Sequence, residues 1–194
     1  MLVLHGQVRS RALRVLWLLE ELDLPYRFDP VDPRSPEAFA VSPLGKIPAL
    51  TTPDGVLFDS VAIMTWLADR EGRFTHPAGT MERARQDAMT QAVLELLDAP
   101  LWEMAKHGFV LPEGERLDGM RASVTAQVAR HSGDLAGLFD GDWVAGPRPT
   151  VPDILLAHCA GWARGLKMDL DGRVLDHMKR MRARPSFGRA MDHG

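Results

Sequence analysis

The sequence contains very little cysteine and very little tyrosine, and both scarcities narrow the chemistry it can perform. Its 194 residues include one cysteine, Cys159, and one tyrosine, Tyr26. A single thiol cannot form a disulfide within the chain or build a metal site from several cysteines. No pair of histidines has metal-ligand spacing, and neither a phosphate loop nor a dinucleotide fingerprint is present. We therefore predict a protein without a bound metal, in a reducing compartment.

No charge of one sign dominates, and no apolar run is long. The 23 basic and 26 acidic residues give a net charge of −3 and a pI of about 6.2, so nothing marks a nucleic-acid or anionic-membrane partner. The apolar start turns polar at His5, too soon for a signal-peptide core, and no later stretch reaches the ~18 apolar residues of a membrane span. We expect a cytoplasmic protein that binds neither nucleic acid nor membrane.

The first seventy residues alternate between strand and helix patterns. We predict a strand at 2–5, a helix that starts at Ser10, a strand at 25–28, a hairpin at 49–58 and a helix that Ser60 caps. On the first helix we expect the charged residues to lie on the face opposite the apolar one; they are Arg11, Arg14, Glu20 and Glu21. The order is that of a βαβ unit followed by ββα.

Beyond residue 79 the strand patterns disappear and helical spacing takes over. Thr150-Val151-Pro152-Asp153 is a Ser/Thr-x-x-acid arrangement before an apolar run, which predicts a helix with a capping box. We predict two domains, an α/β domain at 1–73 and an all-helical domain at 80–194. A linker between them falls in residues 70–79.

Several segments, in their order along the chain, resemble the cytosolic glutathione transferases. The helix from Ser10 to Leu22 is similar to the first helix of a serine-type branch of that family. The run Pro43 to Leu50 resembles the family's cis-proline loop, and Asp59-Ser60 its acid–serine helix start. The resemblance implies a thioredoxin-like N-terminal domain, an all-helical C-terminal domain, glutathione as co-substrate and a role in detoxification.

The resemblance also implies which residues hold glutathione. A cis bond between Ile47 and Pro48 leaves the Ile47 backbone free to pair with the cysteinyl residue, as an added strand would. The γ-glutamyl carboxylate suits the Ser60 hydroxyl and the N–H groups at a helix start, and its ammonium suits Asp59. Lys46 lies near the loop and is a candidate partner for a glutathione carboxylate.

The start of the first helix is the candidate region for activating the glutathione thiol. A hydroxyl that donates to a thiolate stabilises it by about 1.5–3 kcal/mol, and a helix start adds about 0.3–1 kcal/mol. Ser10 is the candidate catalytic residue, with Arg9 or Arg11 assisting; the alternative is that Ser10 only caps the helix. Tyr26 follows this helix and Cys159 lies far along the chain, so tyrosine-type and cysteine-type mechanisms are disfavoured.

We predict an enzyme that conjugates glutathione to small apolar electrophiles. The resemblance also implies a homodimer, with Asp59 near the subunit boundary. Trp102 and His107 are candidates for the electrophile pocket. Two alternatives stay open: a glutathione-dependent peroxidase on the same fold, and a non-catalytic module that binds glutathione or a partner.

Overall fold

The computed structural model describes all 194 residues, which form two compact units. Unit 1 comprises Met1–Ala78 and Arg182–Gly194, and unit 2 comprises Gly79–Met181. These units differ from the predicted domains at the C-terminal end of the chain. Residues 182–194, which sequence analysis grouped with the helical domain, belong to unit 1 because their last helix packs against the first helix of the chain.

Unit 1 is built on a four-stranded mixed sheet of order β2-β1-β3-β4. Strand β1 pairs in parallel with β2, and antiparallel pairs join β1 to β3 and β3 to β4. The strands are β1 (Leu2–Gly6), β2 (Tyr26–Pro30), β3 (Ala49–Thr52) and β4 (Gly55–Phe58). The predicted βαβ–ββα order and thioredoxin-like fold are confirmed.

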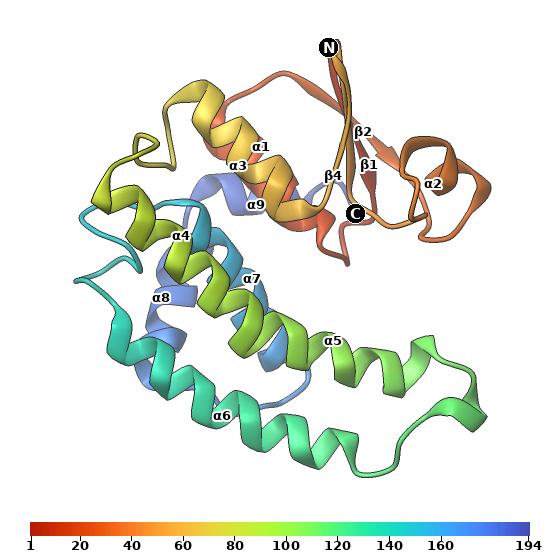
Figure 1. Ribbon diagram of the computed structural model, residues 1–194, viewed down its shortest axis with the longest axis vertical. Coiled ribbons are helices and arrows are strands. Elements are labelled where there is room, and N and C mark those ends of the chain that lie inside the picture. The colour runs from red at the N-terminus through yellow and green to blue at the C-terminus, as the bar shows by residue number, and fades with distance from the viewer. The chain divides into compact units, whose positions relative to one another are not determined.

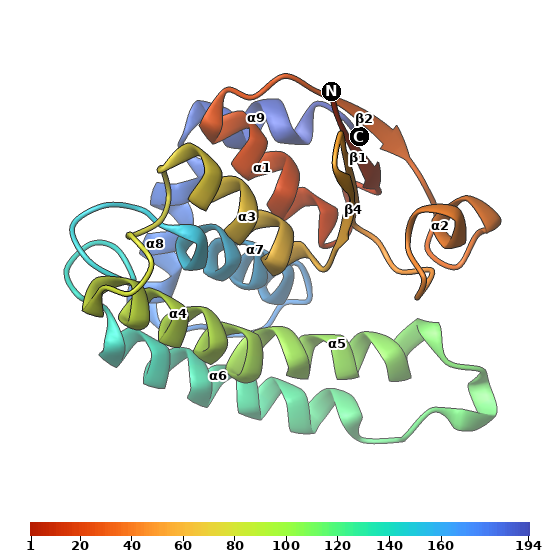
Figure 2. The ribbon, with the colours of Figure 1, turned by 45° about the horizontal axis from the view of Figure 1, so that its top comes forward.

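Helices cover the two faces of this sheet unequally. Figure 2 shows three helices beside one another on one face and a short helix, α2, on the other side. The three are α1 (Ala12–Leu22), α3 (Ser60–Glu71) and α9 (Pro185–Met191), and the short one is α2 (Pro36–Val41). Helix α1 contacts both α3 and α9, so it is enclosed on several sides.

This enclosure corrects the prediction that the charged residues of the first helix form a solvent face. Arg14 is completely buried, and Glu21 is only 7% exposed. The Glu21 carboxylate accepts hydrogen bonds from the Arg184 guanidinium and the Ser186 hydroxyl of the α9 segment. Sequence periodicity could not show this burial, because the partner segment lies more than 160 residues away.

A buried histidine links three neighbouring strands. His5 of β1 has Nδ1 at 2.9 Å from Asp29 Oδ2 on β2 and Nε2 at 2.9 Å from Thr51 Oγ1 on β3. The histidine is 7% exposed, so its polar atoms need partners, and these two bonds satisfy both ring nitrogens. The trio therefore stabilises the end of β1 from which the candidate site continues.

Unit 2 is helical, as predicted for this part of the chain. A long helical rod turns back into α6, and α7 packs against α4 (Figure 1). The rod consists of α4 (Met81–Val93), π-helical η1 (Leu94–Asp98), α5 (Ala99–Ala105) and π-helical η2 (Lys106–Val110). After the short 3-10 turn η3 (Glu113–Glu115) come α6 (Met120–Leu138), α7 (Val151–Gly165) and α8 (Gly172–Arg182).

A proline inside the rod accompanies the π-helical turn η1. Pro100 has no N–H and cannot donate to the Leu96 carbonyl one turn earlier. The His131 Nδ1 atom of α6 lies 2.9 Å from that carbonyl oxygen. Because a carbonyl only accepts, Nδ1 carries the hydrogen and satisfies the group that the proline leaves open.

The predicted capping box at the start of α7 is confirmed. The buried Asp153 carboxylate accepts from the Thr150 N–H at 2.7 Å and the Thr150 hydroxyl at 3.0 Å. It also accepts from the Val144 N–H and from Nε2 of His177 on α8. One side chain thus fixes the helix start, the preceding loop and a neighbouring helix.

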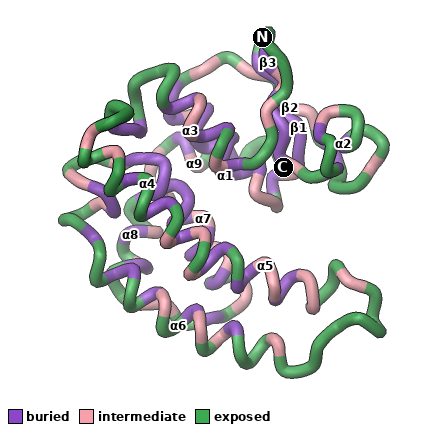
Figure 3. Tube along the Cα trace, viewed as in Figure 1, coloured by how far each residue is buried: buried purple, intermediate pink, exposed green.

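The segment between α5 and α6 is the most exposed part of unit 2. Figure 3 shows most of it as exposed, and residues 112–119 are all exposed. Buried residues instead gather along α7, ten of whose fifteen positions are buried. No helix of the chain combines the length and the hydropathy that a membrane crossing needs.

Candidate glutathione site

The candidate site begins where β1 ends and the chain turns toward α1. Gly6 closes the strand, and a Cβ atom placed there would lie 2.6 Å from the Ala12 Cβ. The same position is 3.8 Å from the Ile47 Cβ and from the Pro48 Cα. Only a glycine allows this approach, which brings the start of α1 against the loop before β3.

The loop before β3 has the predicted backbone form. The bond between Ile47 and Pro48 is cis. Pro48 is buried, Ile47 is half-buried and Lys46 is exposed. Ala49, the first residue of β3, pairs with His5 on one side and with Phe58 on the other, so the loop lies beside the end of β4.

Asp59, which follows β4, has an unusual backbone. Its φ of 72° and ψ of 125° lie in a region that residues other than glycine rarely adopt. Its Oδ1 atom accepts from the Val61 N–H at 2.9 Å and the Ala62 N–H at 3.0 Å, which caps α3. Asp59 is exposed, whereas Ser60 is only 2% exposed. Strain of this kind collects at functional sites, where the surrounding structure holds it in place.

The Ser10 hydroxyl both donates and accepts a hydrogen bond at the start of α1. It donates to the Gln7 carbonyl at 2.6 Å and accepts from the Ala12 N–H at 3.1 Å. The second bond is that of a helix cap, two positions before Ala12, at which the helix begins. Ser10 and Arg11 are half-buried, and Arg9 is exposed.

A contact between two helices joins these segments, and sequence analysis missed it. Arg14 Nη1 of α1 lies 3.4 Å from the Ser60 Oγ at the start of α3. The helix starts that carry Ser10 and Ser60 therefore lie near each other, beside the cis-proline loop. One signal was available: an arginine one turn after Ser10, in a stretch that is otherwise apolar.

Three groups of unit 1 with shifted pKa values, Glu20, Glu21 and Tyr26, lie away from this site, around the far end of α1. Burial raises the pKa of the Glu21 carboxyl, but the hydrogen bonds from Arg184 and Ser186 outweigh it and hold that pKa below its usual value. Burial and a bond to Glu20 raise the pKa of the Tyr26 hydroxyl well above its ordinary range. Because the Tyr26 hydroxyl already donates to Glu20 at 2.7 Å, it is unsuited to activating a thiol.

The two candidates for the electrophile pocket lie in unit 2. Trp102 is half-buried on α5, and His107 is half-buried in η2. The His107 Nδ1 accepts a hydrogen bond from the Leu117 N–H at 3.2 Å and so closes the exposed segment between the helices. This bond gives His107 a structural role, and a role in binding the electrophile remains a prediction for both residues.

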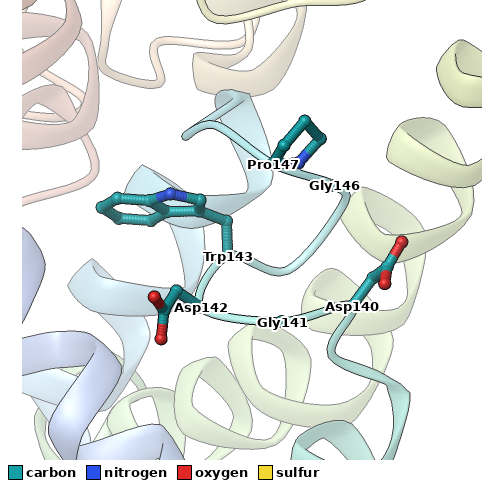
Figure 4. Close-up of a pocket in the computed structure, with 6 residues that line it drawn as sticks. All are labelled: Asp140, Gly141, Asp142, Trp143, Gly146 and Pro147. Carbon is teal, nitrogen blue, oxygen red and sulfur yellow. The ribbon is translucent and has the colours of Figure 1, made fainter.

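A surface hollow of about 360 Å³ lies in the loop between α6 and α7, and it contains none of the predicted site residues. It is lined by Asp140, Gly141, Asp142, Trp143, Gly146 and Pro147. Figure 4 shows that the two carboxylates point away from each other. The polar groups do not converge, so the hollow offers no cation site.

Neither the cysteine nor any acidic cluster offers other chemistry. Cys159 is completely buried on α7, and its thiol is 3.7 Å from Asp98 Oδ1. No group of three or more histidine, cysteine, aspartate or glutamate side chains is placed to hold a metal ion. The start of α1, the cis-proline loop and the start of α3 are therefore the arrangement that points to function.

A mixed sheet of this order, with a cis-proline loop before β3 and a helical unit after it, defines a thioredoxin-like protein with an all-helical second part. Comparison with known proteins identifies the family. The sequence model of the glutathione S-transferase N-terminal domain matches residues 9–70. Glutathione S-transferase GstA of Escherichia coli O157:H7 is 30% identical over 159 residues, 79% of this chain and 76% of that protein.

Two further relatives agree. Glutathione S-transferase 3 of Schizosaccharomyces pombe is 42% identical over 83 residues, which are 40% of this chain and 34% of that protein. The crystal structure of a glutathione transferase from Methylococcus capsulatus is 26% identical with a TM-score of 0.83, over all of this chain and 98% of that one. The chain belongs to the glutathione S-transferase family. The predicted family, fold class and enzyme class, a glutathione transferase, are confirmed.

Proposed function

We propose that this chain uses glutathione as co-substrate and conjugates its thiolate to small apolar electrophiles. The observation that carries the proposal is the meeting of three segments in unit 1. These are the start of α1 with Ser10, the cis Ile47-Pro48 bond and the Asp59-Ser60 start of α3. Together they offer a hydroxyl, the backbone of Ile47 outside the strands and an acid–serine pair, which match the parts of the tripeptide.

In this proposal each part of glutathione has its own partner. The Ile47 backbone pairs with the cysteinyl residue, next to the buried ring of Pro48. Ser60 donates to the γ-glutamyl carboxylate, and the second oxygen of Asp59 receives the ammonium, since the first caps α3. We assign the other carboxylate of the peptide to Lys46, which is exposed.

Ser10 activates the thiol in the proposed reaction. Lowering the pKa of a thiol from ~8.5 by about 2 requires roughly 2.7 kcal/mol, which a hydroxyl donor and a helix start supply together. The Ser10 hydroxyl donates to the neutral Gln7 carbonyl in the free protein. A thiolate is a charged acceptor and forms the stronger bond, so the hydroxyl hydrogen turns toward it when glutathione binds.

We further propose a homodimer with Asp59 close to the subunit boundary. Strand β4 is an edge strand that ends immediately before Asp59. Two of its apolar side chains, Val56 and Phe58, are 45% and 46% exposed. Exposed apolar groups on an edge strand favour association, and a second copy of the chain is the partner that the family resemblance implies.

One observation favours a second candidate, a glutathione-binding module without transferase activity. The Ser10 hydroxyl already serves as donor to Gln7 and acceptor from Ala12, which is the bonding typical of a helix cap. If that arrangement persists in the complex, glutathione binds with an ordinary thiol.

Turnover with a chloronitroaromatic, compared with turnover of an organic hydroperoxide, tests the proposal. Conjugation that exceeds hydroperoxide reduction supports the transferase, and the reverse order indicates the peroxidase that sequence analysis kept open. Binding of glutathione without either reaction indicates the module. Absence of glutathione binding contradicts the proposed site itself.

A further inference from the structure

Arg14 is a buried cation in contact with the proposed glutathione site. Its side chain is completely buried, although arginine is among the residues least often buried. One of its partners is the hydroxyl of Ser60, 3.4 Å from Nη1, and Ser60 is itself 2% exposed. A positive charge therefore lies directly behind the hydroxyl group that we assign to the γ-glutamyl end of glutathione.

The chemistry of the two groups fixes the direction of this hydrogen bond. A guanidinium has five N–H donors and no acceptor, so Ser60 Oγ is the acceptor. The single hydrogen of the Ser60 hydroxyl is then left for another partner. Arg14 thus turns a group that can donate or accept into a donor, which is what binding of a carboxylate requires.

The start of α3 makes this donor more important than it would be elsewhere. A ligand carboxylate at a helix start commonly uses the first free N–H groups of that helix. Here the Val61 and Ala62 N–H groups both donate to Asp59 Oδ1, at 2.9 and 3.0 Å. Recognition of a ligand carboxylate therefore depends on Ser60 and on the charge behind it.

We propose that Arg14 is a positioning residue for glutathione, which holds the Ser60 hydroxyl as a donor to the α-carboxylate of the γ-glutamyl residue. This inference rests on the proposed function, in which Ser60 binds that carboxylate. Arg14 acts through Ser60 and lies behind it in the core of unit 1. Its effect is specific to the negative charge at one end of the peptide.

The test compares two ligands by calorimetric titration: glutathione, and glutathione whose γ-glutamyl α-carboxylate is converted to a carboxamide. The measured quantity is the preference, the ratio of the two dissociation constants in one protein preparation. We expect the wild type to bind glutathione more tightly than the carboxamide. Arg14→Met should reduce this preference about tenfold, mainly by lowering the affinity for glutathione. In the Ser60→Ala background, Arg14→Met has no further effect on the preference.

Two variants separate this role from a purely structural one. Arg27→Met removes an exposed arginine of β2 that pairs with Asp29, and the preference stays at the wild-type value. Arg14→Lys keeps the charge but not the planar fork of donors, so its preference falls between those of the wild type and the methionine variant. If Arg14→Met does not fold, the lysine variant decides, and a wild-type preference there overturns the inference.

The remaining outcomes are also decisive. Equal weakening of both ligands by Arg14→Met shows that the arginine only supports the fold, which overturns the inference and leaves the proposed function intact. An undiminished effect of Arg14→Met in the Ser60→Ala background overturns the path through Ser60. A wild type that binds neither ligand contradicts the proposed function as well.

Discussion

At the scale of single residues, α1 differs from what its sequence pattern predicted, because two of its charged side chains are buried. Arg14 and Glu21 lie on a helix whose remaining faces are almost entirely buried. Each of the two side chains forms a hydrogen bond with a segment distant in sequence. Arg14 donates to Ser60, and Glu21 accepts from Arg184 in the α9 segment. Removing one partner of such a pair costs more than the pair contributes, because the other group stays buried.

Glu21 gives a prediction on acid stability. Its folded pKa lies below the usual value of 4.5, because the bonds from Arg184 and Ser186 outweigh the effect of burial. The stability that it contributes is therefore complete above about pH 4.5 and is lost as the pH falls through the lowered pKa. Glu21→Gln lowers the free energy of unfolding by about 2 kcal/mol at neutral pH, and the deficit shrinks in acid.

Urea denaturation at several values between about pH 3.5 and 7 measures this effect. Asp54→Asn, at an exposed position in the hairpin turn, is the control and changes the stability little at any pH. A Glu21→Gln deficit that is the same in acid and at neutral pH would show that the carboxylate charge contributes nothing to folding.

Sequence analysis named the candidate residues of the site but did not predict the contact of Arg14 with Ser60. Ser10, the cis-proline loop and Asp59-Ser60 form local motifs, so their types and spacing are visible in one short stretch. The contact of Arg14 with Ser60 joins residues 46 positions apart, and no periodicity signals it. Ser60 was predicted to cap the helix that follows, and this prediction was wrong: Asp59 caps α3 from a strained backbone, and Ser60 is the first residue of the helix.

At the scale of elements, the start of α7 depends on a single carboxylate. Asp153 is completely buried and accepts from Thr150, Val144 and His177. Asp153→Ala leaves these donors buried without an acceptor, each at a cost of about 1–3 kcal/mol, so we expect a loss of at least about 3 kcal/mol. Thermal and urea unfolding of the variant measure it.

The matched control is Asp176→Ala on α8. Its carboxylate is exposed and pairs with Lys179 one turn away, at 2.9 Å. Exposed pairs of this kind contribute little to stability, so the control stays close to the wild type. Equal losses for the two variants would contradict the central place given to Asp153.

Some elements could be predicted from sequence and others could not. The capping box of α7 was predictable because a Thr, a Pro and an Asp within four residues are typical of a helix start. The π-helical turn η1 was not, because its Leu96 carbonyl, beside Pro100, is bonded by His131, which lies 35 positions away in the sequence.

At the scale of the whole molecule, the order of strands and helices was sufficient to predict the layout, but not the place of the last helix. Helix α9 belongs to unit 1 because it packs on α1, with Phe187 at 4.7 Å from the Trp17 ring. The chain therefore leaves unit 1 at residue 78 and returns to it at residue 182. A boundary drawn from composition alone cannot reveal such a return.

The proposed homodimer gives a prediction at this scale. The wild type should have a solution mass of about twice the 21.5 kDa of one chain, as light scattering after gel filtration measures. Phe58→Glu places a charge among the exposed apolar groups of β4 and shifts the protein to the mass of one chain. Phe109→Glu, at a 72% exposed position in unit 2, leaves the mass unchanged.

The solution mass of the wild type is the first test of the proposed homodimer. A monomeric wild type contradicts the proposed dimer outright. A dimer that Phe58→Glu leaves intact shows that another surface joins the subunits, and the proposed boundary near Asp59 then fails.

The central claim is that the start of α1 turns the thiol of bound glutathione into a thiolate. The most direct measurement is the pH titration of thiolate absorbance for glutathione bound to the wild type and to Ser10→Ala. We predict that bound glutathione titrates about 2 below the ~8.5 of a free thiol, and that Ser10→Ala restores the free value. A thiol that titrates near 8.5 in the wild-type complex would contradict the account and leave a protein that binds glutathione without activating it.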